Sequence, residues 1–443
     1  MVNVLISFSR ITLLSFVIVF TIIDLFQIFE NRLSEVAAQI LSTIQSVMVV
    51  LFLVNASIIL YMARENDFTI IVLMILQLLL FGVTSFVLSR LAYISSRALI
   101  NNVFMLLSFS FIALERLKMP SATRQFVFTI ISVLIASLVV AILRKIRHID
   151  RMLYIFGAFG VLLLLLVSFL GKVEYGAKLS LSFGSISIQP SEFVKLLYLF
   201  FISGCIVYYK DIRGILISLA GVILHVLILV SSRDLGTALI FLATYLLIIF
   251  IAYKNYIVLF LGIGAASIGG LLALKLFPHI QNRFIAWSDP LSVVDDKGYQ
   301  ISQSLFAIGT GGWLGSGLTN GMPNKIPVVT KDFIFAAISE EMGAIVGICL
   351  IMILLSTTVL IFNKAFSCTN SFYMLVTSGI AIIFAIQTIL NIGGVIKFIP
   401  STGVTLPFVS YGGSSLLSMF ICFFITECSD ELIYVGKGRR YYD

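Results

Sequence analysis

The chain has 443 residues, of which 60% are hydrophobic and only 11% are charged, and its mean hydropathy is +1.11. About a quarter of the residues of a soluble globular domain are charged, so this composition excludes a single large soluble domain. The formal net charge of +8 comes from basic residues dispersed over short polar segments. This dispersal favours membrane topology over nucleic-acid binding, and we expect no nucleic-acid partner.

Hydrophobic runs of about 20 residues recur from end to end, and each is long enough to cross a bilayer as a helix. The first run is longer than the core of a usual signal peptide, and no small-residue cleavage site follows it. The sequence predicts thirteen membrane-spanning helices, at about residues 11–29, 37–62, 68–88, 98–115, 125–143, 152–170, 191–208, 214–230, 235–252, 256–277, 333–362, 371–396 and 405–428.

Most of the connecting segments are short, and the long exception is 278–332. Its glycines, prolines and scattered charges predict short helices and turns instead of a separate domain. Pro190 predicts that the seventh span begins there, because proline suits the first turn of a helix. The five cysteines lie in or beside apolar runs without metal-ligand spacing, and the three histidines form no cluster. We therefore predict buried cysteines and no metal site.

Lysine and arginine positions predict the orientation. With the C-terminus in the cytoplasm, basic residues concentrate in the inside segments 144–151 and 210–213 and in the tail 431–443, as the positive-inside rule requires. The basic segment 116–124 runs against this pattern. Counting the spans back from a cytoplasmic C-terminus then places four polar segments outside the cytoplasm, at residues 186–195, 231–237, 278–332 and 397–415. We predict that these segments converge on one site at the outer face of the membrane.

Two of these segments contain charges at the edge of a span. Glu192 and Lys195 are three residues apart and share one helix face, where they can pair. Such a pair is either an interfacial ion pair or the polar wall of a substrate groove, because charges in a span are costly unless they are paired or face a polar cavity. Asp234 and Gly236 suit an ordinary tight turn between two spans.

The long segment contains a glycine-dense stretch at residues 308–317, which permits turns and close backbone approach to a ligand but lacks a Walker-type ending. It ends at Lys331 and Asp332, where a span begins. Asp332 is either a helix N-terminal acid or a functional carboxylate. Glu340 and Glu341 point to different sides of the same helix, so we predict that at least one of them ties this helix to a neighbour.

In order and spacing, these segments resemble the SEDS (shape, elongation, division, sporulation) family, which includes FtsW, RodA and SpoVE. The matching motifs are Gln189–Glu192 with Lys195, Asp234–Thr237, Gly298–Gln300 with Gln303, Asp332–Phe335 with Glu340–Gly343, Asn391–Gly393 and Gly403–Ser415. The resemblance implies an all-α polytopic protein whose ten-helix glycosyltransferase core occupies residues 90–430. An extension of about three helices, residues 1–89, would precede this core, and a cytoplasmic basic tail, residues 431–443, would follow it.

The resemblance also implies an activity, which is the polymerisation of lipid II into peptidoglycan strands at the outer face of the bacterial cytoplasmic membrane. Lipid II is an undecaprenyl-pyrophosphate-linked disaccharide peptide. The family works beside a class B penicillin-binding protein, a transpeptidase, and other divisome or elongasome membrane proteins. The process served would be division, elongation or sporulation.

Asp332 matches the catalytic aspartate of the family, and we expect it to be the general base of an inverting transfer. The residues expected to bind substrate are Arg283, Glu192, Lys195, Asp234, Lys331, Gln300, Gln303 and Ser410. A divalent cation, Mg²⁺ or Mn²⁺, would suit the pyrophosphate, although no dedicated carboxylate cluster is visible. The chain departs from the family pattern at Arg233, where proline is usual.

Two alternatives remain open at this level, namely a transporter that flips lipid-linked precursors and a non-catalytic scaffold for a cell-wall synthesis complex. The polar motifs on one side of the membrane and the lack of an internal repeat favour the enzyme, because alternating access uses a site at the midplane between repeats. Since every candidate catalytic residue follows residue 90, we also expect a chain without residues 1–89 to fold and to retain some activity.

Overall fold

The computed structural model describes residues 2–29, 34–92, 95–174, 177–183, 186–430 and 432. The predicted basic tail, residues 431–443, lies outside these ranges apart from Leu432. Within them, twelve helices are long and apolar enough to cross a membrane, and a further apolar helix, α16 (Gly413–Glu427), is shorter. Each of the thirteen predicted runs overlaps one of these helices.

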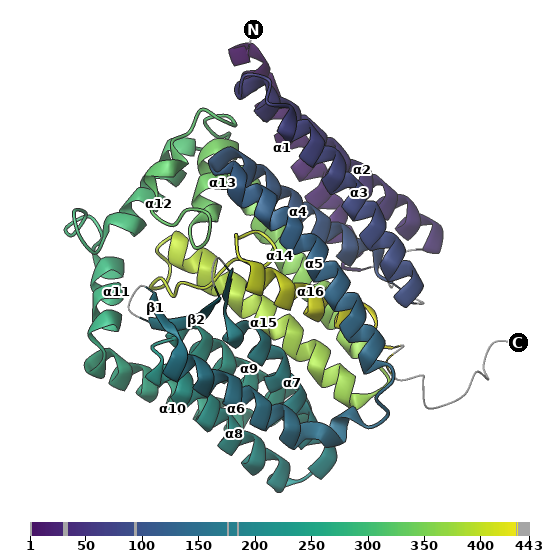
Figure 1. Ribbon diagram of the computed structural model, residues 1–443, viewed down its shortest axis with the longest axis vertical. Coiled ribbons are helices and arrows are strands. Elements are labelled where there is room, and N and C mark those ends of the chain that lie inside the picture. The colour runs from purple at the N-terminus through teal and green to yellow at the C-terminus, as the bar shows by residue number, and fades with distance from the viewer. Residues whose placement is uncertain are drawn as a thin grey trace, which may run out of the picture.

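The first three helices form a layer along one side of the bundle (Figure 1). They are α1 (Val2–Gln27), α2 (Glu35–Ala63) and α3 (Phe68–Leu91), and they pack against α4 (Arg97–Leu117), α5 (Met119–Leu143) and α14 (Ala344–Ser367). Because this layer covers one side of α4 and the rest of the bundle covers the other, the whole 18-residue apolar window of α4 is buried.

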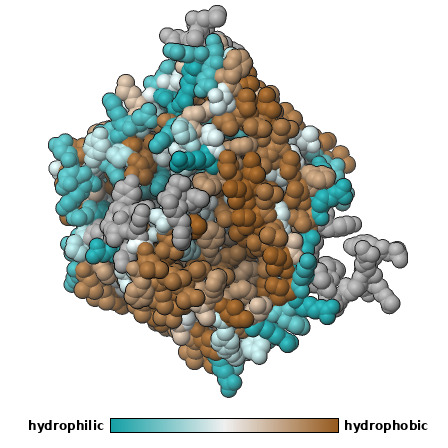
Figure 2. Space-filling model, in the orientation of Figure 1, coloured by the Kyte–Doolittle hydropathy of each residue, from teal (hydrophilic) through white to brown (hydrophobic). Residues whose placement is uncertain are grey.

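Two further helices, α7 (Pro190–Tyr209) and α15 (Ser371–Val395), are buried over most of their length. The rest of this part of the bundle consists of η2 (Ile149–Met152), α6 (Leu153–Leu170), α8 (Ile212–Ser231), α9 (Leu235–Tyr253) and α10 (Tyr256–Leu276). As predicted, α7 begins at Pro190. Figure 2 shows a broad apolar zone between hydrophilic residues at the upper left and lower right, which is the pattern of a bundle that crosses a bilayer.

The long segment 278–332 folds as short helices and turns, as predicted. It contains α11 (Pro278–Ser288), α12 (Tyr299–Gly311) and η3 (Pro323–Lys325). A small antiparallel sheet of β1 (Lys172–Glu174), β2 (Ala177–Phe183) and β3 (Ile186–Ile188) was not predicted. Its signal was the alternation of apolar and polar residues over 177–183, which has the period of a strand.

The predicted span at residues 333–362 is corrected by the structure, because it divides into α13 (Ile334–Met342) and α14. The break lies at Gly343, whose φ of +93° favours glycine. A Cβ atom there would lie 2.4 Å from the backbone nitrogen of Gly315. The glycine-dense stretch thus lets two backbones approach each other at the break, where the amide of Ser316 donates to the carbonyl of Glu340 at 2.9 Å.

Candidate active site

A polar cavity of about 310 Å³ lies where four distant segments meet. Apart from Leu179 on β2, its lining comes from residues 189–195, 233–237, 282–332 and 401–405, which belong to the four polar segments that the sequence predicts will converge. Among the described residues, its charged lining consists of four basic and three acidic side chains: Lys195, Arg233, Arg283, Lys297, Glu192, Asp234 and Asp332. The excess of basic groups suits an anionic ligand.

One wall of the cavity is built at the start of α7 and α9. Lys195 Nζ lies 2.9 Å from Glu192 Oε1, and both side chains are almost completely buried. Asp234 caps α9, because its Oδ1 accepts a hydrogen bond from the amide of Thr237 at 3.2 Å. Its Oδ2 accepts from the hydroxyl of Ser191 at 3.4 Å. The capping bond explains why an aspartate precedes this helix, and the second bond joins the two helix starts.

Asp332 lies in the loop just before α13, and the main chain around it is held from both sides. Asn391 on α15 donates through Nδ2 to the carbonyl of Asp332 at 3.0 Å and to that of Val404 at 2.7 Å. The hydroxyl of Ser410 donates to the carbonyl of Lys331. One buried asparagine therefore fixes the segment with Asp332 against residues 401–405, which form the opposite part of the lining.

Arg283 and Asp332 flank a single opening in the cavity. Arg283 on α11 donates through Nη1 to the carbonyl of Ser401 at 3.2 Å. Gly403, with a φ of +73°, leaves the space between the two side chains empty. A Cβ atom at Gly403 would lie 3.7 Å from Arg283 Nη2 and 3.8 Å from Asp332 Oδ2. A reacting group at this position would touch both a carboxylate and a guanidinium.

Burial dominates the electrostatics of these groups. It raises the pKa of Asp332 from 3.8 to about 6, against the opposing charges of Lys331 and Arg283. Burial also raises the pKa of Asp234, although hydrogen bonds from Thr237 oppose the shift. Asp332 is therefore mostly ionised at neutral pH but is a stronger base than an exposed aspartate.

The structure brings most of the predicted site residues together. Those that line the cavity are Asp332, Arg283, Glu192, Lys195, Asp234 and Gln300. Three predicted residues do not line it: Lys331, Gln303 and Ser410. Of these, Ser410 braces the loop before Asp332, since it also accepts from the amide of Leu406 at 2.9 Å, and Lys331 acts on Asp332 through its charge.

Several lining residues were missed as site residues, including Asn282, Lys297 and Arg233. Asn282 is next to Arg283, and Lys297 precedes the Gly298–Gln300 motif, so proximity to the motifs was a signal that could have identified them. Arg233 has a left-handed φ of +63°, which proline cannot adopt. Arg233, in place of the usual proline, thus allows a left-handed backbone conformation and adds a basic group to the cavity.

No metal site was predicted, and the described part of the chain holds no group of three or more His, Cys, Asp or Glu side chains that could bind a metal ion. The nearest approach to such a set in the cavity is Glu192, Asp234 and Asp332. Glu192 is paired with Lys195, and Asp332 faces Arg283. Glu192 and Asp332 are thus matched to basic side chains, and Asp234 caps α9.

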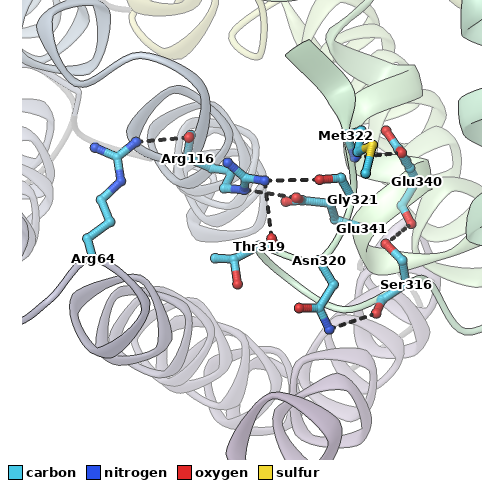
Figure 3. A network of polar contacts seen from close by, with 9 residues as sticks. All are labelled: Arg64, Arg116, Ser316, Thr319, Asn320, Gly321, Met322, Glu340 and Glu341. Carbon is cyan, nitrogen blue, oxygen red and sulfur yellow. Dashed lines mark hydrogen bonds and ion pairs between the residues drawn. The ribbon is translucent and has the colours of Figure 1, made fainter. Parts of the chain in front are cut away.

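A polar network outside the cavity holds the loop before Asp332 (Figure 3). Arg116 at the end of α4 donates through Nε to Glu341 Oε1 at 2.9 Å and through Nη2 to the carbonyl of Gly321 at 3.1 Å. Glu340 accepts from the amide of Met322 at 2.8 Å. Both glutamates thus tie α13 to neighbouring segments, which confirms the prediction made for them. Arg64, the residue that follows α2, extends the network by donating to the carbonyl of Arg116 at 2.9 Å.

Comparisons with known proteins agree with this architecture. "Peptidoglycan glycosyltransferase RodA" of Mycobacterium tuberculosis (strain ATCC 25618 / H37Rv) is 34% identical over 322 residues, which cover 68% of each chain. "Stage V sporulation protein E" of Bacillus subtilis (strain 168) is 36% identical over 298 residues, or 64% of this chain and 78% of the relative.

Two solved structures share the fold. A chain from a work entitled "Structural coordination of polymerization and crosslinking by a peptidoglycan synthase complex" has a TM-score of 0.65 at 23% identity and covers 77% of this chain and 98% of that chain. The rod shape determining protein RodA of Thermus thermophilus has a TM-score of 0.56 at 23% identity, covering 79% and 98%. The family model for FtsW, RodA and SpoVE, described as cell cycle protein, matches residues 89–430. The chain therefore belongs to the FtsW/RodA/SpoVE family.

Proposed function

We propose that this chain is a peptidoglycan glycosyltransferase that polymerises lipid II into glycan strands at the outer face of the bacterial cytoplasmic membrane. The observation that carries the proposal is the opening at Gly403, where the Asp332 carboxylate and the Arg283 guanidinium flank one space in a polar cavity. The names of the relatives support the reaction, and the positive-inside pattern supports the outer face.

Asp332 acts as the general base. Strand extension requires a sugar hydroxyl to attack an anomeric carbon, and the carboxylate accepts the hydroxyl proton as the new glycosidic bond forms. The pKa of about 6 leaves Asp332 ionised at neutral pH while keeping it basic enough to take that proton. A single displacement inverts the anomeric centre, so α-linked lipid II yields a β-linked strand.

Arg283 stabilises the departing lipid pyrophosphate. As the anomeric carbon–oxygen bond breaks, negative charge develops on the leaving phosphate, and a guanidinium can hold two of its oxygens at once. Lys195 and Lys297 add positive charge to the same cavity. A divalent cation, Mg²⁺ or Mn²⁺, would enter this cavity only together with the pyrophosphate whose charge it neutralises.

The partner proposed for this chain is a class B penicillin-binding protein, which would cross-link the strands, together with other divisome or elongasome membrane proteins. The support is the shared fold with a chain whose reported complex coordinates polymerisation and crosslinking.

The test is polymerisation of lipid II by the purified protein in detergent, with products resolved by length. We expect Asp332→Asn to lower the rate by about 10²–10⁴ because loss of a general base typically costs that much. The matched control is Asp295→Asn, which removes an exposed loop carboxylate and should leave the rate unchanged. Wild-type polymer yield from Asp332→Asn would overturn the assignment. If the wild type instead flips lipid II in liposomes and Asp332→Asn abolishes that flipping, the transporter is favoured.

A further inference from the structure

The segment that leads to Asp332 folds back on itself. Residues 316–332, named the Asp332 loop, lead into α13, and the end of α13 returns to the start of this loop. There the amides of Ser316 and Gly317 each donate at 2.9 Å to a carbonyl near the end of α13. The Asp332 loop and α13 therefore form one closed unit, and the contacts that close this unit help to set the position of Asp332.

Arg116 of α4 holds the unit where it closes (Figure 3). Its guanidinium donates through Nε to Glu341 at 2.9 Å and through Nη2 to the carbonyls of Thr319 and Gly321, at 3.3 and 3.1 Å. Thr319 has a left-handed φ of +80°, which a β-branched residue keeps only when the surrounding structure holds it there. At Gly321 a Cβ atom would lie 2.8 Å from Glu341 Cγ. Arg116 thus grips the loop where its backbone is strained and tightly packed.

The contacts of Arg116 also explain part of the basic segment 116–124, which runs against the positive-inside pattern. The side chains of Arg116 and Glu341 are 18% and 4% exposed. A buried carboxylate needs its cation, because loss of one partner leaves an uncompensated charge. This arginine therefore serves a contact within the protein and is not a signal of membrane topology.

Arg116 is itself held from outside the core, by Arg64. The carbonyl of Arg116 lies in the last turn of α4, and the residue four positions farther along is Pro120, which has no N–H group to donate. Arg64 Nη2 donates to this carbonyl at 2.9 Å. A cationic side chain at the C-terminal end of a helix is also favoured by the helix dipole. Arg64 therefore caps α4 at the residue whose side chain grips the Asp332 loop.

The turn between α2 and α3 fixes the main chain of Arg64. Its amide donates to the carbonyl of Leu60 at 3.0 Å, and its carbonyl accepts from the amide of Asp67 at 3.1 Å. Asp67 caps α3, because its Oδ1 accepts from the amide of Thr69 at 3.0 Å. Two helices of the extension thus set the origin of the Arg64 side chain, and the family model, which matches residues 89–430, does not include them.

We propose that Arg64 is a positioning residue through which the N-terminal extension holds Asp332 in the cavity. By capping α4, Arg64 keeps the Arg116 guanidinium on Glu341 and on the Asp332 loop. The closed unit in turn keeps Asp332 beside the opening at Gly403. The effect on catalysis rests on the proposed function, whereas the link from Arg64 to the loop does not.

Hydrogen–deuterium exchange of the full chain in lipid nanodiscs tests the link from Arg64 to the loop. We expect Arg64→Ala to speed exchange at residues 316–322, which include three amides bonded to the end of α13, while α15 exchanges as in the wild type. Arg64→Lys should recover part of the protection, because an ammonium can still donate to the Arg116 carbonyl. The matched control is Arg90→Ala, which should leave exchange in the loop unchanged. It removes an exposed arginine of α3 that lies over the ring of Phe86 in the same helix.

A double variant shows whether Arg64 acts through Arg116. Arg116→Ala should itself speed exchange at residues 316–322, and adding Arg64→Ala should cause no further change, because two effects that share one route do not add. Unchanged loop exchange in Arg64→Ala would overturn the proposal, and so would a further increase in the double variant. Faster exchange in α15 would also overturn it, because Arg64 would then support the whole fold.

Steady-state kinetics with lipid II test the effect on Asp332. In Arg64→Ala we expect kcat to fall by as much as about 10²-fold with KM unchanged, because a misplacement of about 1 Å can cost that much. Arg64→Lys should recover part of kcat, and Arg90→Ala should keep all of it. Faster loop exchange with the wild-type kcat would overturn the positioning role. If the wild type makes no polymer, the proposed function fails, while the exchange measurements still support or overturn the link from Arg64 to the loop.

Discussion

Asp332 is half-buried and has basic groups beside it. Desolvation alone would favour the neutral acid, and the charges of Lys331 and Arg283 oppose this, so its pKa is held at about 6. A base with such a pKa is useful only while it is deprotonated. The pH dependence of the reaction rate should therefore report the protonation of the Asp332 carboxylate.

We expect kcat/KM for lipid II to fall as the pH is lowered through about 6. Below that pH the protonated Asp332 cannot accept the hydroxyl proton, so the rate should drop about tenfold per pH unit, and above it the rate should level off. Initial rates between pH 5 and 8 measure this limb. The residual activity of Asp332→Asn should not show this fall in rate at low pH. An identical fall in that variant would assign the titration to another group.

Arg283 offers a test of geometry as well as of charge. We expect Arg283→Ala to weaken the use of lipid II strongly and Arg283→Lys to recover only part of the loss. An ammonium keeps the charge but cannot hold two phosphate oxygens in the fork that a guanidinium provides. KM and kcat measured for the wild type, Arg283→Ala and Arg283→Lys show how much of the loss the lysine recovers. Equal activity in all three would place pyrophosphate recognition on another basic residue, of which Lys297 and Lys195 line the same cavity.

At the scale of elements, the site depends on a short helix that does not cross the membrane by itself. α13 is nine residues long, and its orientation follows from contacts at both ends. Asn391 and Ser410 hold the main chain before it, and Arg116 holds Glu341 near its end. Because Asp332 lies two residues before this helix, a contact far from the cavity can affect catalysis.

We expect Arg116→Ala to destabilise this part of the fold by about 3–5 kcal/mol, because it leaves the buried Glu341 without its partner. Glu341→Gln in the same chain should recover part of the loss, since the unpaired charge is then removed. A double-mutant cycle of unfolding free energies measures the coupling. Strictly additive effects would mean that Arg116 acts through the carbonyls of Thr319 and Gly321 alone.

The length of the hydrophobic runs predicts most of the membrane helices. It does not predict where a run is broken into two helices. The run 333–362 contains the polar stretch Ser339–Glu341 just before Gly343. The division into two helices at Gly343 depends on the approach of Gly315 from a distant loop. The same limit applies to the site. Motif order identified Asp332 and Arg283, but whether Ser410 faces ligand or braces a loop depends on side-chain direction, which spacing alone does not determine.

At the scale of the whole molecule, the extension and the core share polar surfaces within the membrane. α4 is the first helix of the region that matches the family model, and it lies between the two parts. Its Asn101 accepts from Ser46 of α2, and its Glu115 accepts from Gln77 of α3. A family core that lacked these helices would expose the same amide and carboxyl groups to lipid. The expectation that residues 1–89 are dispensable therefore changes.

We expect a chain that begins at residue 92 to insert poorly or to unfold easily in detergent, with little polymer made. Removal of α1–α3 exposes Asn101, Asn102 and Glu115 of α4 to hydrocarbon, where unsatisfied polar groups cost several kcal/mol each. Coexpression of a separate fragment of residues 1–91 should restore folding, because the missing partners can pack in trans. Size-exclusion profiles, melting temperatures and lipid II polymerisation compare the three preparations. A truncated chain with the wild-type melting temperature and wild-type polymer yield would show that lipid alone can cover α4.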